Sequence, residues 1–332
     1  MPRKNSASCR ENGLERALGW WPDRSRPRGG DSPELSILET DVQLQLDAFE
    51  VTLRDIAVVG IDQLHALSVA VGWPHRESDW RMLLDLGRGI AAVDEIGRVV
   101  GSVMWFRYAP DFVKVGMLIT SPRLQEQGAG RWLMQRVHEL NKGSVFGLTA
   151  TRAARRLYRS LGYGHEQKVL QCQGRAVVPA DVRAVVAGSL RPVRPADHDA
   201  LLDLDRAAVG CDRSAMFRRL LPLSTGHVLV RNGETVAFAL CRQFGRGHVI
   251  GPVIAATEED AIAVAMPHVE AHAGGFLRAD TPAANAAFTG FLAAAGMQVH
   301  DTVTSMGLGR APFRPASADG PRRMALASHT LG

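Results

Sequence analysis

The spacing of apolar residues changes several times after position 50, and each change predicts a different secondary-structure element. Spacings of three and four residues predict helices at residues 62–71, 78–86, 131–140 and 153–161. Runs rich in β-branched and aromatic residues predict strands at residues 90–93, 99–106, 113–120 and 145–148. The polar stretch 94–98 should join the first two strands as a hairpin. Ser78 or Asp79 is the expected N-cap of the second helix, and Gly162 is the expected left-handed end of the last.

The second half of the chain repeats this pattern. Leu53 and Asp62, near the start of the first unit, have counterparts about 137 residues later in Leu190 and Asp199. Similar runs then predict strands at residues 228–231, 235–241 and 248–255, and a helix at residues 285–295. We therefore expect a duplicated α/β unit rather than one large domain, which also suits a length of 332 residues.

Composition sets the expected boundaries of these units. Residues 1–48 are first basic and then acidic, which predicts a flexible leader, and residues 312–332 contain several Pro and Gly, which predicts a disordered tail. We expect no chemistry from either end. The folded part should divide into residues 49–176 and 190–311, joined by residues 177–189 as a linker or a shared strand.

The charge of +5 is concentrated in residues 123–168, where nine basic residues face three acidic ones. This excess suits a multiply charged anion, although a solvated helix face would look the same. It lacks the interleaved aromatic residues of nucleic-acid-binding surfaces, so we expect no nucleic-acid partner. No apolar run approaches the roughly 20 residues that a membrane helix needs, so we expect no membrane partner. The four cysteines are scattered, which predicts no metal site and no disulfide framework and favours the cytoplasm.

The stretch from Gln125 to Gly130 predicts a phosphate-binding loop between a strand and a helix. Gly128 and Gly130 allow the backbone to approach a ligand closely, and the first N–H groups of the helix point outward with the positive end of its dipole. A plain strand-to-helix turn would explain the same glycines. The stretch has no Gly-Lys-Ser/Thr, no complete G-x-G-x-x-G and no kinase motif, so the ligand need not be ATP or NAD.

Two segments together carry a resemblance to a known family. The run from Ser121-Pro122 to Gly130, followed about 27 residues later by residues 157–163 (LYRSLGY), resembles the two signature segments of the GNAT superfamily of acyl-CoA-dependent N-acetyltransferases. The resemblance covers most of residues 51–312 and is to a bacterial subgroup in which a GNAT domain precedes a degenerate GNAT-like one. It implies an α/β (α+β) fold of two tandem GNAT-like domains, each with a mixed, mostly antiparallel central sheet flanked by helices.

The resemblance also assigns residues to acetyl-CoA, the expected co-substrate. The loop would wrap the pyrophosphate, and the preceding strand would splay from its neighbour at a bulge, pair with pantetheine and polarise the thioester carbonyl. The expected acetyl-CoA-binding residues are Leu118, Ile119, Thr120, Gln125, Glu126, Gln127, Gly128, Ala129, Gly130, Arg131, Thr151, Ala154 and Tyr158. Glu126 and Gln127 stand where the subgroup usually has Gly and Arg, which predicts weaker CoA binding. No metal is expected.

Tyr158 matches the position whose phenol commonly protonates the departing CoA thiolate, with core packing as the alternative. The sequence does not identify the group that takes the proton of the amine. His75 has the most convenient ordinary pKa for that task, although a wall residue would look the same. The expected substrate pocket contains Trp73, His75, Trp80 and Trp105, and core packing explains some of these equally well.

These assignments predict an N-acetyltransferase that transfers acetyl from acetyl-CoA directly to a primary amine of a small molecule or peptide. The alternative is a non-catalytic acyl-CoA sensor, which the added carboxylate of Glu126 favours. In the second half, residues 256–261 contain three acids and no glycine, and the last helix has no tyrosine, so this half should be a scaffold. A monomer or a homodimer is expected.

Overall fold

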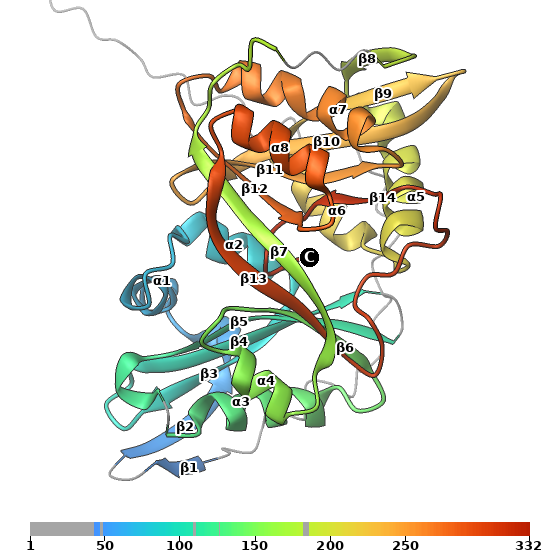
Figure 1. Cartoon of the computed structure of the whole chain (residues 1–332). Coiled ribbons are helices and arrows are strands. Elements are labelled where there is room, and N and C mark those ends of the chain that lie inside the picture. The colour runs from blue at the N-terminus through green and yellow to red at the C-terminus, as the bar shows by residue number, and fades with distance from the viewer. Residues whose placement is uncertain (1–42, 47–48, 109–110, 126, 182–185) are drawn as a thin grey trace, which may run out of the picture. The chain divides into compact units, whose positions relative to one another are not determined.

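The computed structural model describes residues 43–46, 49–108, 111–125, 127–181 and 186–332 (Figure 1). The first half contains β1 (Gln43–Leu46), β2 (Phe49–Asp55), α1 (Ile61–Ala70), α2 (Glu77–Leu86), β3 (Arg88–Asp94), β4 (Val99–Tyr108), β5 (Phe112–Thr120), α3 (Ala129–Leu140), β6 (Val145–Ala150), α4 (Arg155–Ser160) and β7 (Gly164–Arg175). The second half contains β8 (Ser189–Pro192), α5 (His198–Val209), α6 (Ser214–Leu220), β9 (Ser224–Arg231), β10 (Glu234–Phe244), β11 (Gly247–Ala255), α7 (Glu258–Ala271), β12 (Phe276–Pro282), α8 (Ala286–Ala294), β13 (Gln298–Leu308) and β14 (Arg322–Ala325).

One sheet runs through the described residues, with helices packed on its faces. Its strands lie in the order β1-β2-β3-β4-β5-β6-β13-β7-β12-β11-β10-β9-β8, and β14 pairs with β11 outside this path. The neighbours β5 and β6, and also β11 and β12, are parallel, whereas the other pairs are antiparallel. The predicted mixed, mostly antiparallel architecture is therefore confirmed.

Most of the predicted elements form where the pattern places them. The stretch 94–98 joins β3 and β4 as an antiparallel hairpin, and Gly162 has the expected left-handed φ of 89°. The predicted cap of α2 is wrong by two or three residues. Arg76 is the N-cap, and its backbone N–H donates to Asp79 Oδ2 at 2.8 Å, so Asp79 closes a capping box from the third helical position.

The repeat in the sequence corresponds to equivalent positions in the two halves. Asp62 lies in the first turn of α1, and Asp199 lies in the first turn of α5. Leu64 and Leu201, which follow each Asp by two residues, are both fully buried. The periodicity therefore reflects two copies of one helix-and-strand arrangement.

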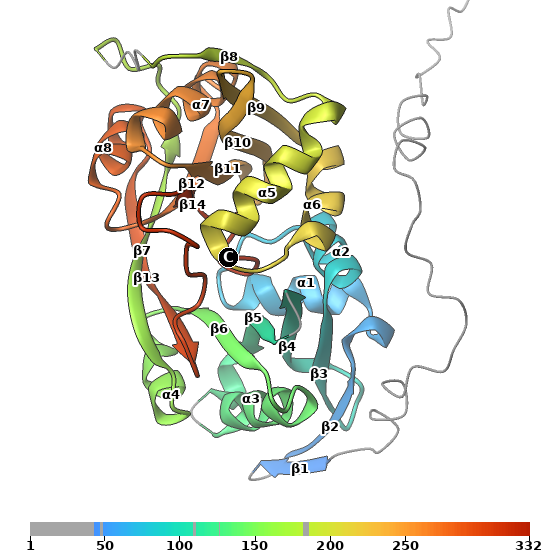
Figure 2. The same cartoon turned by 90° about the vertical axis from the view of Figure 1, so that its right-hand side faces the viewer.

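The two halves exchange their last strands. β13, from the second half, lies between β6 and β7, which belong to the first half. β7 in turn pairs with β12 of the second half, and Figure 2 shows β7 and β13 side by side. The first half thus contributes residues 164–175 to the shared part of the sheet, whereas the described part of residues 177–189, the expected linker or shared strand, contains only the start of β8.

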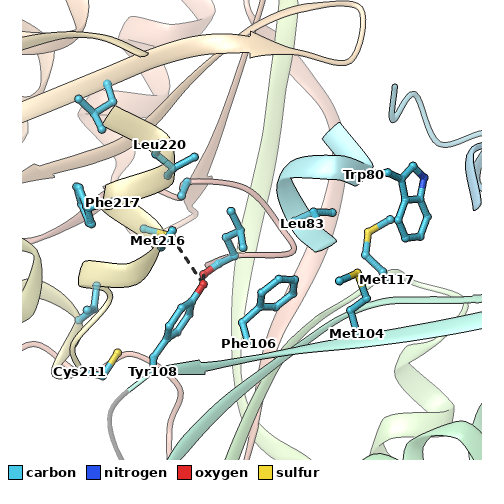
Figure 3. Close-up of a cluster of buried hydrophobic side chains, with 14 of the residues drawn as sticks. Trp80, Leu83, Met104, Phe106, Tyr108, Met117, Cys211, Met216, Phe217 and Leu220 are labelled. Atoms are coloured by element: carbon cyan, nitrogen blue, oxygen red, sulfur yellow. Dashed lines mark hydrogen bonds between the residues drawn. The ribbon is translucent and has the colours of Figure 1, made fainter. Parts of the chain in front are cut away.

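A shared hydrophobic core fixes the halves against one another. Figure 3 shows Trp80 and Phe106 of the first half in the same cluster as Phe217 of the second, and all three are at most 1% exposed. Tyr108 Oη lies 3.7 Å from Met216 Sδ and donates to the backbone oxygen of Leu331 at 3.1 Å. Contacts of this kind make the relative position of the halves part of the folded core.

The prediction of a disordered tail at residues 312–332 is wrong. Residues 322–325 form β14, and Leu326, Ala327 and Leu331 are at most 1% exposed. The physical reason is the apolar run that follows residue 323, which gains more from burial than it loses in chain entropy. Of the predicted leader at residues 1–48, only 43–46 are described, as β1, and the remainder lies outside the described residues.

Candidate active site

β5 and β6 pair at one end and separate at the other. Their parallel pairing covers Phe112–Val115 and Val145–Leu148 only, although both strands continue further. Opposite this point, the pairing of β5 with β4 shifts register between Ser102 and Met104, and Met117 has a φ of 51°. The expected splay at a bulge is therefore present, and the backbone of β5 beyond Val115 has no partner strand on its β6 side among the described residues.

α3 begins beside this opening at a glycine with a left-handed backbone. Gly128 is its N-cap, with a φ of 89°, no side-chain cap and nothing within 4 Å of the position of a Cβ. The first N–H groups of a helix have no intrahelical acceptors and attract anions. An open turn of this kind fits a pyrophosphate group.

The other residues assigned to the loop have mixed positions. Gly130 packs within α3, and a Cβ there would lie 3.3 Å from Leu157 Cδ2, so this glycine allows α3 to approach α4 rather than a ligand. Arg131 Nη2 donates to Ser160 Oγ at 2.6 Å, which also joins α3 to α4. Ala129 is buried, whereas Gln127 and Gln125 are exposed. Glu126 lies outside the described residues.

The strand residues and the start of α4 complete the predicted binding set. Leu118, Ile119 and Thr120 lie on β5 beyond the point of separation, and the oxygen of Thr120 accepts a hydrogen bond from Gln125 Nε2 at 3.3 Å. Thr151 lines the cleft described below. Ala154, the N-cap of α4, donates its backbone N–H to Thr151 Oγ1 at 3.4 Å.

A cleft of about 280 Å³ lies where the splay meets the second half. The first half contributes Gly116, Met117 and Thr149 from the separated strands. The rest of the lining includes the β10–β11 turn, β12, β13 and residues 328–330, so both halves and the C-terminal segment form it. The cleft is thus a product of the strand exchange and of the shared core.

His75 lies in this cleft among aromatic rings. Its ring centroid is 5.7 Å from that of Trp73, which also lines the cleft, and 5.6 Å from that of Phe244 of the second half. Its Nδ1 atom is buried and has no hydrogen-bond partner among the described residues. Burial lowers the pKa of His75 to about 4, although the carboxylate of Asp79 acts in the opposite direction. The imidazole is therefore neutral at pH 7 and can accept a hydrogen bond.

Two of the predicted pocket residues lie elsewhere. Trp80 is fully buried and donates from Nε1 to Ser68 Oγ at 2.8 Å. Trp105 is 7% exposed and packs in the core beneath α3. Their prediction as cleft-lining residues is wrong, because each side chain points to a hydrophobic face of its element.

Tyr158 lies on α4 in the core of the first half. It is 6% exposed, and its ring packs edge-on against Tyr163 with centroids 5.8 Å apart. Burial raises the pKa of Tyr158 well above its ordinary value, so the phenol keeps its proton over the physiological range. Such a group can donate a proton but cannot act as a base.

The second half contributes charged groups that the sequence did not reveal. Arg278 binds the carboxylate of Asp280 through Nε and Nη2, both at 2.9 Å, and His329 Nε2 lies 3.3 Å from Asp280 Oδ1. Burial alone would raise the pKa of Asp280, but the charges and hydrogen bonds of Arg278 and His329 together outweigh it and hold the pKa far below its ordinary value. The apolar run just before Ser328 was the available signal that this segment is folded.

The second half has its own splay, and the chain fills it. β11 and β12 pair in parallel only at His248 and Val249, and beyond them β14 pairs with residues 253–255 of β11. The acids at the start of α7 have structural partners: Asp260 binds Arg231 at 2.8 Å, and Glu258 Oε2 accepts the N–H of Phe288 at 2.6 Å. Two acids at the start of α7, which follows β11 as α3 follows β5, are therefore engaged in contacts within the protein.

No group of three or more His, Cys, Asp or Glu side chains within the described ranges is arranged to hold a metal ion. In the same part of the chain, none of the helices has the length and apolarity required to cross a membrane.

Comparison with known proteins gives the same description for both halves. The sequence matches the acetyltransferase (GNAT) domain family over residues 86–165 and again over residues 201–318. No curated protein matches it. A presumed acetyltransferase from Pyrococcus horikoshii has a similar structure, with a TM-score of 0.70 and 17% identity over 85% of this chain and 96% of that one.

Two further solved structures share the fold. A GCN5-related N-acetyltransferase from Sphaerobacter thermophilus has a TM-score of 0.55 and 14% identity over 77% of this chain and 95% of that one. A tandem GNAT protein from the clavulanic acid biosynthesis pathway has a TM-score of 0.55 and 15% identity over 77% of this chain and 98% of that one.

Proposed function

This chain belongs to the GNAT family of acetyltransferases, with one such domain in each half, and from this premise we propose that its first half acetylates a primary amine. The acetyl group comes from acetyl-CoA and passes directly to a small-molecule or peptide amine while both substrates are bound. The observation that carries the proposal is the separation of β5 from β6 beside the open N-terminus of α3. The unpaired edge of β5 can pair with an extended ligand, and the N-terminus of α3 can bind the phosphates of that ligand.

The residues around this opening have distinct proposed tasks. Backbone N–H groups of β5 near Leu118 polarise the thioester carbonyl, which favours the charge that develops on its oxygen. Tyr158 donates a proton to the departing thiolate. His75, which is neutral, accepts a hydrogen bond from the amine and orients it. With a pKa of about 4, His75 is too weak a base to hold the proton of the amine at pH 7.

We further propose that the second half binds no acetyl-CoA and instead shapes the acceptor side of the cleft. β14 occupies the splay between β11 and β12, where a second thioester would have to pair. Phe244 and Arg278 of this half line the cleft directly. The backbone N–H of Gly245 donates to Asp79 Oδ2 at 3.2 Å, which ties this wall to α2 of the first half.

The decisive experiment measures thiol release from acetyl-CoA with the purified protein against polyamines, aminoglycosides, amino acids and short peptides. We expect release that depends on one class of amine, and calorimetry should show one acetyl-CoA bound per chain. A protein that binds acetyl-CoA and releases no thiol with any amine would contradict the proposal. Two bound molecules per chain would contradict the assignment of the second half.

Gly128→Ala should weaken acetyl-CoA binding by about tenfold or more. A Cβ at this left-handed position strains the turn that presents the N–H groups of α3. Gly143→Ala is the matched control, because Gly143 has a φ of 80° and equally open surroundings beyond the other end of the same helix. Both variants should lose similar stability, about 1 kcal/mol, and calorimetry should find weaker binding only for the first. Equal affinities for both would show that the loop does not bind the ligand.

A further inference from the structure

Lys114 is a buried amine without an acidic partner. It lies on β5, two residues before Gly116, and is 1% exposed. Its Nζ lies within hydrogen-bonding distance of Thr149 Oγ1, at 3.0 Å, and no carboxylate of the described residues pairs with it. Burial of an unpaired ammonium group is costly, so such a lysine is either neutral or retained for a function.

Thr149 connects this amine to the cleft. It lies on β6 at the point where the two strands separate, and it lines the cleft together with Gly116 and Met117. On β5, Lys114 and Gly116 share one face of the strand, so the amine lies behind the wall that the acetyl group would face. A single hydroxyl therefore separates Lys114 from the space in which the two substrates would meet.

The charged groups around Lys114 favour its neutral form. Burial lowers the pKa of Lys114 well below its ordinary value of 10.5, and the positive charges of Arg323 and Arg213 act in the same direction. Arg213 is itself paired with Asp205 in the core, so that carboxylate already has a partner. A neutral amine has a lone pair, which an ammonium group lacks.

We propose that Lys114 accepts the proton of the substrate amine through the hydroxyl of Thr149. This inference rests on the acetyltransferase function proposed above and supplies the proton acceptor that His75 cannot be. Thr149 is the group that touches the substrate, and Lys114 acts through it.

The Thr149 hydroxyl passes its proton to the lone pair of Lys114 Nζ and takes one from the substrate ammonium, which becomes a free amine. The amine nitrogen forms a bond to the thioester carbon, and the bond from that carbon to sulfur breaks. Tyr158 gives its proton to the CoA sulfur, and the second proton that the nitrogen loses restores the phenol. The proton on Lys114 returns through Thr149 to solvent, so the enzyme is restored.

The test compares Lys114→Met and Thr149→Val with the wild type in the thiol-release assay across pH. Both variants keep the volume of the side chain and remove the relay. We expect kcat to fall by about 10²-fold or more in both variants, with little change in the affinity for acetyl-CoA. The KM for the amine should change little in Lys114→Met and should rise in Thr149→Val, which loses the group that touches the substrate. The wild-type kcat should rise to a plateau with pH, whereas in Lys114→Met it should rise about tenfold per pH unit without a plateau, because hydroxide must then remove the proton.

Thr149→Ser and Lys142→Met are the controls. The serine keeps a hydroxyl at the same place and should restore most of the turnover, and Lys142 is exposed beyond α3, so its loss should change nothing. If Lys114→Met turns over like the wild type with the same pH profile, the inference is wrong while the proposed function stands. If the wild type itself releases no thiol with any amine, the proposed function fails and the inference fails with it.

Stability measurements separate a lost relay from a damaged fold. Because the folded state lowers the pKa of Lys114, the unfolded chain binds more protons, and the cost of burying this amine grows as pH falls from 10.5. Lys114→Met should therefore melt about 2 °C or more above the wild type at neutral pH, and this difference should shrink as pH approaches 10.5. A Lys114→Met protein that melts below the wild type at every pH would contradict a neutral lysine and would overturn the relay with it.

Discussion

Replacing Tyr158 with phenylalanine should lower kcat for thiol release by about 10²- to 10⁴-fold, the usual contribution of a general acid. The departing thiolate needs a proton, and burial raises the pKa of Tyr158, so the phenol is protonated at neutral pH. The same shift makes it a weaker acid than a free tyrosine, and it gives up its proton only as negative charge develops on the sulfur. The substitution removes one oxygen and leaves the ring packed against Tyr163. Affinity for acetyl-CoA, measured by calorimetry, should change little.

Tyr163→Phe is the matched control for this prediction. Tyr163 is the neighbouring buried ring, and its hydroxyl contacts His138 Nε2 at 2.9 Å. Its loss should cost about 1 kcal/mol of stability and leave kcat unchanged. Equal turnover by the wild type and Tyr158→Phe would assign Tyr158 to core packing alone. A wild type that binds acetyl-CoA without any thiol release would instead favour the sensor.

The first half of the chain, residues 1–188, should not fold by itself. Without β13, the strands β6 and β7 lose the partner that lies between them, and β7 also loses β12. The fragment further exposes the apolar surface that Trp80 and Phe106 bury against Phe217. Each large apolar side chain that is exposed costs about 1.5 to 3 kcal/mol, and several of them exceed the total stability of a typical domain, about 5 to 15 kcal/mol.

Circular dichroism and thermal melting of the fragment test this expectation, and co-expression with residues 189–332 is the control. The two fragments together should recover a cooperative transition and acetyl-CoA binding, because they contain every strand of the sheet. A fragment 1–188 that melts cooperatively at the temperature of the full chain would show that the exchanged strand is dispensable.

Local patterns predicted most of the individual elements but not how the halves join. Apolar spacing and turn residues located the hairpin at residues 94–98 and the left-handed Gly162 because both depend on short-range geometry. The exchange of β7 and β13 leaves no such signal, since a strand has the same alternation whichever half it pairs with. The prediction for the C-terminal segment was wrong because the Pro- and Gly-rich residues 312–321 indicate disorder, whereas the four apolar residues 324–327 that follow them are buried.

The sequence predicted only part of the candidate site, because it does not show which way a side chain points. Trp73 and His75 line the cleft, whereas Trp80 and Trp105 do not, and the sequence shows that a residue is aromatic but not which face of the element it occupies. Lys114 was overlooked although it is the single charged residue within β5. A lysine in an otherwise apolar strand is the signal that would have found it.

The pairing of β14 with β11 has a consequence for any ligand of the second half. Because β14 belongs to the same chain as β11, it competes with free molecules for the edge of β11 at an effective concentration that is typically millimolar. It cannot diffuse away from that edge. A thioester from solution would have to displace this resident strand and expose Met324 and Ala325, which are fully buried. We therefore expect the cellular CoA supply to leave that half unchanged, so the molecule responds to acetyl-CoA at one place only.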